Sequence, residues 1–378
     1  MRCLLACLFC FAAIPAQTFV VDAANGPGTD FTDLDTAVNT VPSGAVLLVR
    51  AGQYGSFTIS GKSLTVLGEV GVTMAAPAAS VTVDGLAVGQ RVLLRGLRTA
   101  DSGGLTTFAC LNVAGEIVLD QVGGAGFSES RFVATACAQV TINDCAFASN
   151  GSAAVITASD VTMNHCTLSS GHNAFPGVQL LQQPGLEASL SRVQLSGCEV
   201  AGRGSPFVPA PPAVLLQNAA LRADGGSLLR ADTGFQATFG LAIAGSGSAR
   251  LTPDVTLAGA PPLVAATVSV LVVDLPAVLV SGGAFGGVSA ATMTGGSGRL
   301  GVLWIGLPGP AVPFPSGDPL SIGNGVILAF AVMGAPLQAN VVIPAQPTLV
   351  GAVLGWQGLT LDSLGGIELT NAWPFVLR

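Results

Sequence analysis

The chain has 378 residues, of which 9% are charged and 50% are hydrophobic, and its formal net charge is −7. This acidic balance argues against nucleic acid as a partner, because nucleic-acid binding needs clustered positive charge. The 50 glycines and 23 prolines argue against a helical protein. They also break the apolar sequence into runs shorter than the roughly 20 residues of a membrane-spanning helix.

Residues 1–16 differ from the rest of the chain. A basic Arg2 precedes a continuous apolar run from Cys3 to Ile14, and Pro15-Ala16 supplies a small-residue cleavage point. This order is typical of a secretory signal peptide, and a buried first helix is the alternative. Cleavage would remove three of the eight cysteines and leave five, an odd number that excludes a complete disulfide framework. We therefore expect a protein that is secreted or displayed at the cell surface.

The mature chain begins with a predicted strand at residues 19–22 and a predicted helix near residues 32–40. Thr32 is the expected N-cap of this helix, because Asp35 completes a Thr-x-x-Asp capping box. Pro42 ends the helix. One face of the helix is apolar and carries Phe31, Leu34 and Val38. Such a face must pack against other apolar residues.

A repeat occupies the middle of the chain. Residues 140–147 and 161–168 match position for position, 21 residues apart. Each octet has alternating apolar residues, then an asparagine followed by one more polar residue, and then a cysteine. Other copies of this frame begin at Leu64, Val92, Ile117 and Val193, with a weaker copy at Ala219. Alternation of this kind is strand periodicity. Leucine-rich repeats have a similar period, but they need a Leu-x-x-Leu frame that is absent here.

The period predicts the architecture. The successive steps between copies are 28, 25, 23, 21 and 32 residues, and the longest step holds an insertion. A period of 21 to 25 residues, with short strands broken by turn residues, describes one coil of a parallel β-helix. Each coil would hold three short strands and would stack on the next at about 4.8 Å. We expect about eight or nine such coils across residues 18–260.

Three cysteines hold the same place in successive coils, namely Cys145, Cys166 and Cys198. An unpaired cysteine behaves as a small hydrophobic residue, so the spacing predicts an inward ladder of reduced cysteines. A disulfide is one alternative, although side chains on adjacent parallel strands point the same way. A metal site is the other alternative, although no paired ligands stand at zinc spacing. We expect neither a metal nor a cofactor.

The repeat stops at the Gly/Pro-rich stretch 259–262, where we place a domain boundary. Apolar strands separated by irregular turn signals follow, and they are predicted at residues 267–274, 300–305, 326–332 and 348–356. This pattern is typical of an antiparallel β-sandwich. The expected all-β organisation is a signal peptide at 1–16, a parallel β-helix at 17–262 and a sandwich-like domain at 263–378.

Several motifs resemble those of one protein family. They are Thr29–Val38, Pro42–Gly44, Leu47–Tyr54 and Lys62–Gly68. Together they are similar to the N-terminal segment of right-handed parallel β-helix proteins of the pectin-lyase-like superfamily, and the resemblance covers roughly residues 18–260. It implies a right-handed solenoid whose N-terminal end is plugged by the predicted helix. Residues 347–362 and 366–371 resemble a tail domain that recurs on secreted bacterial proteins. Neither resemblance is specific for an activity.

The resemblance implies a polysaccharide groove on the outside of the solenoid, but no catalytic motif of its lyases, hydrolases or esterases is present residue by residue. The candidate catalytic residues are Asp144 and His165, which hold equivalent places on adjacent coils, about 5 Å apart. His165 could act as an acid or a base near neutral pH. The simpler interpretation is that Asp144 and His165 are a solvated pair of turn residues. Beside them, Asn143 and Asn164 would stack as an asparagine ladder that hydrogen-bonds to the backbone of the turns, and Asp120 would extend this ladder.

Two functions remain open on these grounds. The first is a secreted or surface-displayed, non-catalytic β-helix protein that binds a glycan or another surface, because its long strand face carries almost no ionisable constellation. The second is a polysaccharide lyase or glycoside hydrolase acting along the groove, which rests on fold likeness alone. We expect polysaccharide or cell-surface components as partners, no membrane anchor beyond the signal peptide, and a monomer.

His172, on an insertion loop, is expected in solvent.

Overall fold

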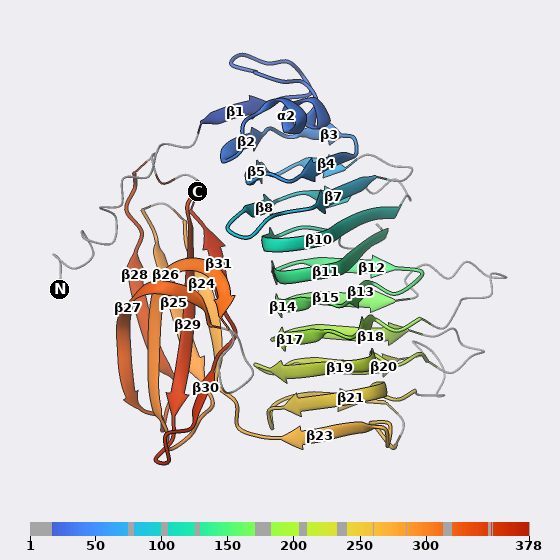
Figure 1. Cartoon of the computed structure of the whole chain (residues 1–378), viewed down its shortest axis with the longest axis vertical. Helices are drawn as coiled ribbons and strands as arrows, with labels where there is room; N and C mark the ends of the chain where they lie inside the picture. Colours follow the sequence, from blue (N-terminus) through green and yellow to red (C-terminus); the bar gives the residue numbers. More distant parts are fainter. Residues whose placement is uncertain are drawn as a thin grey trace.

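The computed structural model is dominated by β structure and has a single α-helix among the described residues (Figure 1). The structure describes residues 17–74, 79–99, 105–124, 129–170, 183–203, 210–232, 240–259, 261–284, 286–312, 320–346, 349 and 351–377. The expected signal peptide at 1–16 and His172 lie outside these ranges. Within them, no helix has both the length and the apolar character needed to cross a membrane. The predicted all-β class is confirmed.

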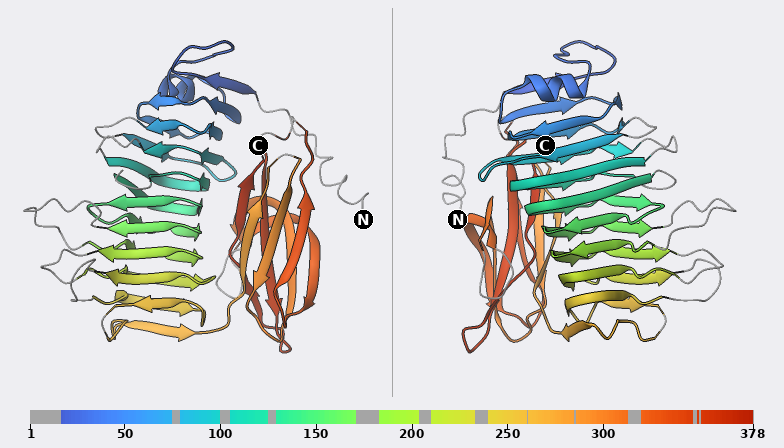
Figure 2. Two further views of the ribbon diagram at one scale, coloured as in Figure 1. Left: turned by 180° about the vertical axis from the view of Figure 1, so that it is seen from behind. Right: turned by 45° about the vertical axis from the view of Figure 1, so that its right-hand side comes forward.

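Parallel strands between residues 18 and 272 stack into three faces (Figures 1 and 2). The first face holds β1 (Thr18–Val21), β2 (Ala45–Val49), β5 (Leu64–Gly68), β8 (Arg91–Arg95), β14 (Asp160–Asn164), β17 (Arg192–Ser196) and β23 (Val268–Val272). The second face holds β4 (Phe57–Ser60), β7 (Ser80–Asp84), β13 (Ala154–Thr157) and β16 (Leu186–Ser189). The third face holds β3 (Gly52–Tyr54), β6 (Val72–Met74), β9 (Arg98–Thr99), β12 (Ala146–Ser149), β15 (Thr167–Ser170), β18 (Glu199–Arg203), β20 (Leu228–Asp232) and β22 (Thr256–Ala258).

Four long strands bend from the second face into the first. They are β10 (Leu105–Asp120), β11 (Glu129–Asn143), β19 (Val214–Asp224) and β21 (Ile243–Leu251). Both β11 and β19 pair through each of their halves, so the order β11–β13–β16–β19–β17–β14 returns to β11. The strand pairing therefore closes on itself and forms a barrel of six parallel strands.

The repeat read from the sequence sets the register of the stack. Val140 pairs with Val161, and Val161 pairs with Val193, so the matching octets lie directly above one another. Val193 then pairs with Leu221, which means that the weaker copy is in register from Leu221 rather than from Ala219. Residues at the first and third places of each octet point inward, as their burial shows, and build one continuous core along the stack.

The helix α2 (Leu34–Thr40) closes the N-terminal end of the stack, with Leu34, Ala37 and Val38 fully buried. Its N-cap is Asp33, whose carboxylate accepts a hydrogen bond from the backbone N–H of Thr36 at 2.8 Å. The prediction that Thr32 is the cap was wrong by one residue, because Asp33 reaches the third helical N–H directly and is an equally good capping type.

The cysteine ladder is present. Cys145, Cys166 and Cys198 are all free and 1% exposed, and the backbone N–H of Cys166 donates to the Sγ of Cys198 at 3.4 Å. Burial raises the pKa of the Cys166 and Cys198 thiols well above the usual range, so both stay protonated at neutral pH.

After Val272 the strands pair only in antiparallel fashion within the described residues. One sheet holds β24 (Ala277–Gly282), β25 (Val288–Thr294) and β28 (Leu337–Val342). The other holds β26 (Leu300–Val312), β27 (Leu320–Val332), β29 (Val353–Leu361), β30 (Ile367–Leu369) and β31 (Trp373–Val376). Both sheets contribute to one core, which includes Val278, Met293, Leu303 and Trp356. The parallel stack itself extends to Val272, past the boundary expected at residue 262.

The antiparallel sheets lie beside the first face of the stack and cover much of it (Figures 1 and 2). An apolar patch joins the two parts and consists of Val46, Leu67, Leu93 and Val118 from the stack with Val353 and Val376 from the sheets. Burial of such side chains is the main favourable term in an interface of this kind. The covered part of the first face is therefore an internal surface of the molecule.

The C-terminal segment crosses the strands of the first face along the axis of the stack. Arg95 donates to the carbonyl of Val376 at 3.2 Å, and Asn143 donates to the carbonyl of Pro374 at 2.6 Å. Further along, Arg222 donates to the carbonyl of Leu369 at 2.8 Å. Successive strands of the first face thus bind successive parts of one segment, and this fixes how the sheets sit on the stack.

Candidate functional site

Asp144 and His165 lie at one corner of the stack, directly after β11 and β14. Both residues have left-handed backbone, with φ of 50°. The Oδ1 of Asp144 lies 3.7 Å from the Nδ1 of His165, and the two side chains are 46% and 41% exposed. The His165 ring also packs edge-on against Trp373, with 4.8 Å between ring centroids. The predicted proximity is correct, but an exposed pair at this distance is a weak surface contact.

The asparagine ladder beside this pair is present, but its hydrogen-bond partners differ from those predicted. The Nδ2 of Asn164 donates to the Oδ1 of Asn143 at 2.8 Å, and both side chains are fully buried. Their amides also donate to the carbonyls of Ala372 and Pro374, and Asn371 donates to Asn164. The prediction that the ladder satisfies turn backbone was wrong, because the antiparallel sheets cover these asparagines and take up their hydrogen bonds.

A second polar column lies at the corner between the second and first faces, and we call it the outer column. It consists of Arg91, Glu116, Gln139, Asp160 and Arg192, each one residue before a copy of the repeat. Glu116 pairs with both Arg91 and Gln139, and Asp160 pairs with Arg192. Because the residue after each of them is a core residue, strand alternation turns the outer column away from the core.

In the upper pair of the outer column, Glu116 is buried, whereas the Arg91 side chain is 31% exposed. The Nε of Arg91 lies 2.5 Å from a carboxylate oxygen of Glu116, and the Arg91 guanidinium also donates to the carbonyl of Pro308 at 2.6 Å. Glu116 is only 6% exposed, and its Oε1 has no hydrogen-bond partner among the described residues. Burial raises the pKa of Glu116 above its usual value, and the charge of Arg91 only partly offsets this effect.

The lower pair is more open to solvent. Asp160 and Arg192 form a two-point ion pair, in which the Nε of Arg192 donates to Asp160 at 3.0 Å and a second guanidinium nitrogen contacts the other carboxylate oxygen. Their side chains are 33% and 49% exposed. Both side chains of this ion pair reach solvent, and carboxylate and guanidinium groups are hydrogen-bonding partners for the hydroxyls of a ligand.

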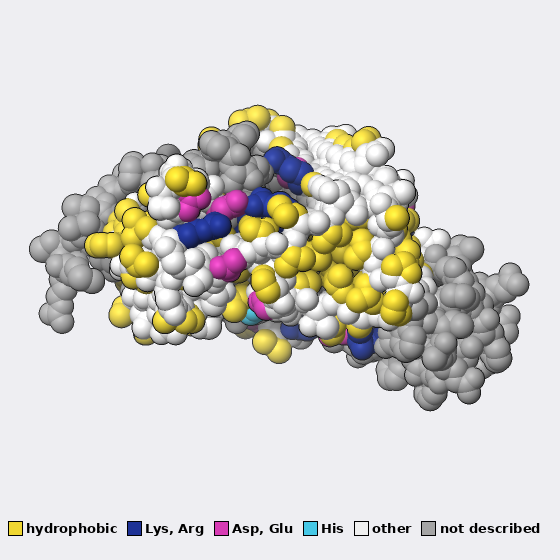
Figure 3. Space-filling model, turned by 90° about the horizontal axis from the view of Figure 1, so that it is seen from below, with side chains coloured by type: hydrophobic (Ala, Val, Ile, Leu, Met, Phe, Trp, Pro, Cys, Tyr) yellow, Lys and Arg dark blue, Asp and Glu magenta, His cyan; other side chains and the backbone are white. Residues whose placement is uncertain are grey.

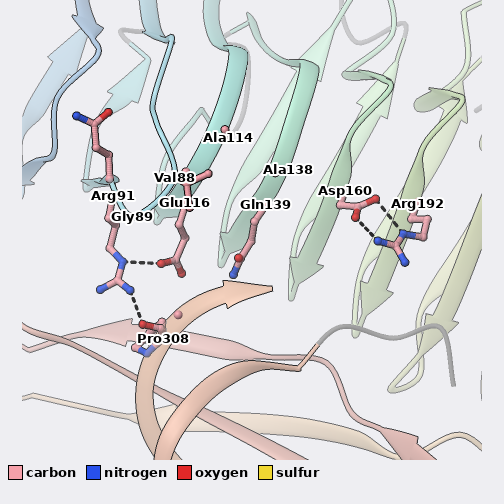
Figure 4. Close-up of a pocket in the computed structure, with 13 residues that line it drawn as sticks. Val88, Gly89, Arg91, Ala114, Glu116, Ala138, Gln139, Asp160, Arg192 and Pro308 are labelled. Carbon is pink, nitrogen blue, oxygen red and sulfur yellow. Dashed lines mark hydrogen bonds and ion pairs between the residues drawn. The ribbon is translucent and has the colours of Figure 1, made fainter. Parts of the chain in front are cut away.

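The outer column lines a cavity of about 630 Å³ between the stack and β26 (Figure 4). Pro308 and Gly309 form its opposite wall. Two shallower depressions of about 550 and 540 Å³ continue from it along the same corner, and Asp160 lines all three. All three share Asp160, and we call the run from Val88 to Ser248 the groove. It spans roughly 29 Å if each of six strand steps adds about 4.8 Å.

The groove has polar and apolar walls, and the apolar part includes the exposed side chains of Val88 and Leu190. Beyond the outer column, its lining includes Asn112, Ser159, Ser191, Asn218 and Ser248, with alanines between them. In the part of the chain that the structure describes, no three His, Cys, Asp or Glu side chains converge as a group that could hold a metal ion. The chemistry that the groove offers is hydrogen bonding from hydroxyl, amide and paired ionic groups.

Comparisons with protein-family models, with curated proteins and with solved structures found no match to this chain.

The outer column was not recognised in the sequence, although a signal for it existed. In five successive copies of the repeat, the residue immediately before the first apolar position is Arg, Glu, Gln, Asp and Arg. In a stack of coils, a polar residue that recurs at one place of the repeat becomes a line of side chains on one edge. The sequence could not show that β26 forms the other wall.

Proposed function

We propose that the parallel stack is a right-handed parallel β-helix related to the pectin-lyase-like superfamily, and that the protein is secreted or displayed at the cell surface. The coil length, the in-register pairing from β1 to β23 and the plugging helix α2 support this fold. The N-terminal motifs support the kinship, and the composition of residues 1–16 supports export.

We infer that the protein binds a glycan along the groove without cleaving it. The observation that carries this proposal is a groove of roughly 29 Å that follows the stack axis and presents a regular line of hydrogen-bonding groups. Elongated surfaces of this kind are how solenoids bind extended ligands. The formal charge of −7 favours a neutral polysaccharide over an acidic one, since an acidic chain would be repelled.

A screen of the whole protein against neutral and acidic polysaccharides tests the proposal, followed by calorimetry on each ligand found. The variant Asp160→Ala/Arg192→Ala removes both partners of the exposed ion pair and leaves no unpaired charge. We expect it to bind at least about tenfold more weakly. The matched control, Asp144→Asn/His165→Gln, removes another exposed pair outside the groove and should bind as the wild type does. Equal binding by the groove variant and the wild type would refute the proposed site.

A glycoside hydrolase is the second candidate, and one observation favours it. Glu116 lines the groove with a raised pKa, as a general acid requires, while Asp160 is more exposed and paired with a cation. They stand two strand steps apart, about 10 Å, near the upper limit of about 9.5 Å for inverting glycosidases. Release of reducing ends by the wild type, abolished in Glu116→Gln, would establish this activity and exclude simple binding.

A further inference from the structure

The two ends of the parallel stack differ sharply. At the N-terminal end, α2 covers the core, and Leu34 and Val38 are fully buried. At the other end, β23 pairs with β21 on one edge and with no other strand among the described residues. Leu271 and Val272 on this last strand are 57% and 62% exposed. The far end of the stack therefore has an open strand edge and exposed apolar side chains.

The exposed side chains belong to the core of the stack. Val270 and Val272 pair with Ala249 and Leu251, which are 1% and 3% exposed in the preceding coil. In the last coil the same positions are uncovered, and Val270 is 40% exposed. The view from below shows a broad apolar patch on this end of the molecule (Figure 3). Terminal repeats of solenoids normally carry a polar outer face or a cap, and open strand edges promote association.

The charge pattern of this end suits a second copy of the chain. No charged residue occurs between Asp254 and Asp274, so the β23 strands of two copies can meet without bringing like charges together. Stacking head to tail would instead bring the patch against α2, which already closes the other end. A twofold rotation, by contrast, lays an edge strand against its own copy in antiparallel orientation, and it gives a closed dimer.

We propose that two copies dock tail to tail through β23 and the apolar end of the stack. Each copy then serves as the missing cap of the other, which covers Val270 and Val272 and pairs the open edge of β23. The interface lies at the end of the stack and does not include the outer column. The proposal stands apart from the glycan-binding function, and it departs from the monomer expected from the sequence.

Light scattering on the full chain over a range of concentrations tests the proposal. The wild type should have the mass of a dimer. The variant Val270→Glu/Val272→Glu places four carboxylates around the twofold axis, and we expect its dimer dissociation constant to rise on the order of 100-fold or more. Both positions are solvent-exposed in the single chain, so the variant should keep the circular dichroism spectrum of the wild type.

The matched control is Val332→Glu on β27, which replaces an equally apolar side chain that is 72% exposed at the edge of an antiparallel sheet. This control should remain dimeric. A wild type that is monomeric at every concentration would overturn the proposal, as would a dimer that resists the β23 variant. A dimer dissociated by Val332→Glu alone would place the interface on the antiparallel sheets. Species larger than a dimer would contradict the closed twofold arrangement.

Discussion

Single residues one or two places apart in this chain have opposite structural roles. Ile142 is fully buried, whereas Asp144 stands at an exposed corner with left-handed backbone. Asp144→Asn should change the free energy of unfolding by less than about 0.5 kcal/mol, because Asn tolerates this backbone and the exposed contact to His165 is weak. Ile142→Asp should cost more than about 4 kcal/mol, because it buries an unpaired charge. Urea denaturation of both variants measures the contrast, and similar losses would contradict the assigned positions.

The raised pKa of Glu116 predicts how the stability of the protein depends on pH. Its folded pKa lies above the ordinary value of 4.5, so the folded protein holds a proton that the unfolded chain releases first. Stability from this group is therefore lost as pH rises from about 4.5 through the raised pKa. Thermal melts across this range should show a steeper decline for the wild type than for Glu116→Gln. Parallel declines would mean that Glu116 titrates normally. Arg91→Lys, which keeps a positive charge beside the carboxyl, serves as the control.

At the scale of elements, the contact between β14 and the C-terminal segment depends on one amide. Asn164 bonds to Asn143, to the carbonyl of Ala372 and to Asn371. Asn164→Ala should destabilise the protein by about 2–4 kcal/mol, because it leaves several buried polar groups without partners. Thr162→Ala on the same strand is the control, and its cost should be smaller. Calorimetry measures both variants. Equal costs would show that Asn164 has no special part in the contact.

The sequence predicts the strands of the stack well, but it predicts poorly which parts of the antiparallel sheets cover them. The octets around Val140 and Val161 define strand, direction and register together, because one period imposes all three. Asn143 and Asn164 could not be placed so readily, since a polar residue after a strand looks the same whether water or another sheet covers it. For the same reason, Glu116 and Asp160 were visible as a recurring polar position but not as the wall of a groove that β26 completes.

At the scale of the whole molecule, the antiparallel sheets complete the parallel stack and do not merely follow it. They cover Leu93 and Val118 on the first face, and they supply Pro308 to the groove. The main cavity of the groove therefore exists only when both parts are assembled. A ligand bound there should accordingly stabilise the contact between them, because ligand binding favours the assembled state by mass action.

A chain that ends at Val272 tests this dependence. It would uncover the apolar patch on the first face, where each buried side chain of this size contributes about 1.5–3 kcal/mol. It would also uncover Asn143 and Arg222, whose hydrogen bonds to the C-terminal segment would be lost. We expect the shortened chain to bind a hydrophobic dye strongly, to melt at a lower temperature and to lose glycan binding. The full chain carrying Val270→Glu/Val272→Glu is the control, since it keeps the sheets and removes only the proposed dimer. A shortened chain that melts like this control without binding dye would show that the stack is stable alone, and that the sheets are an independent module.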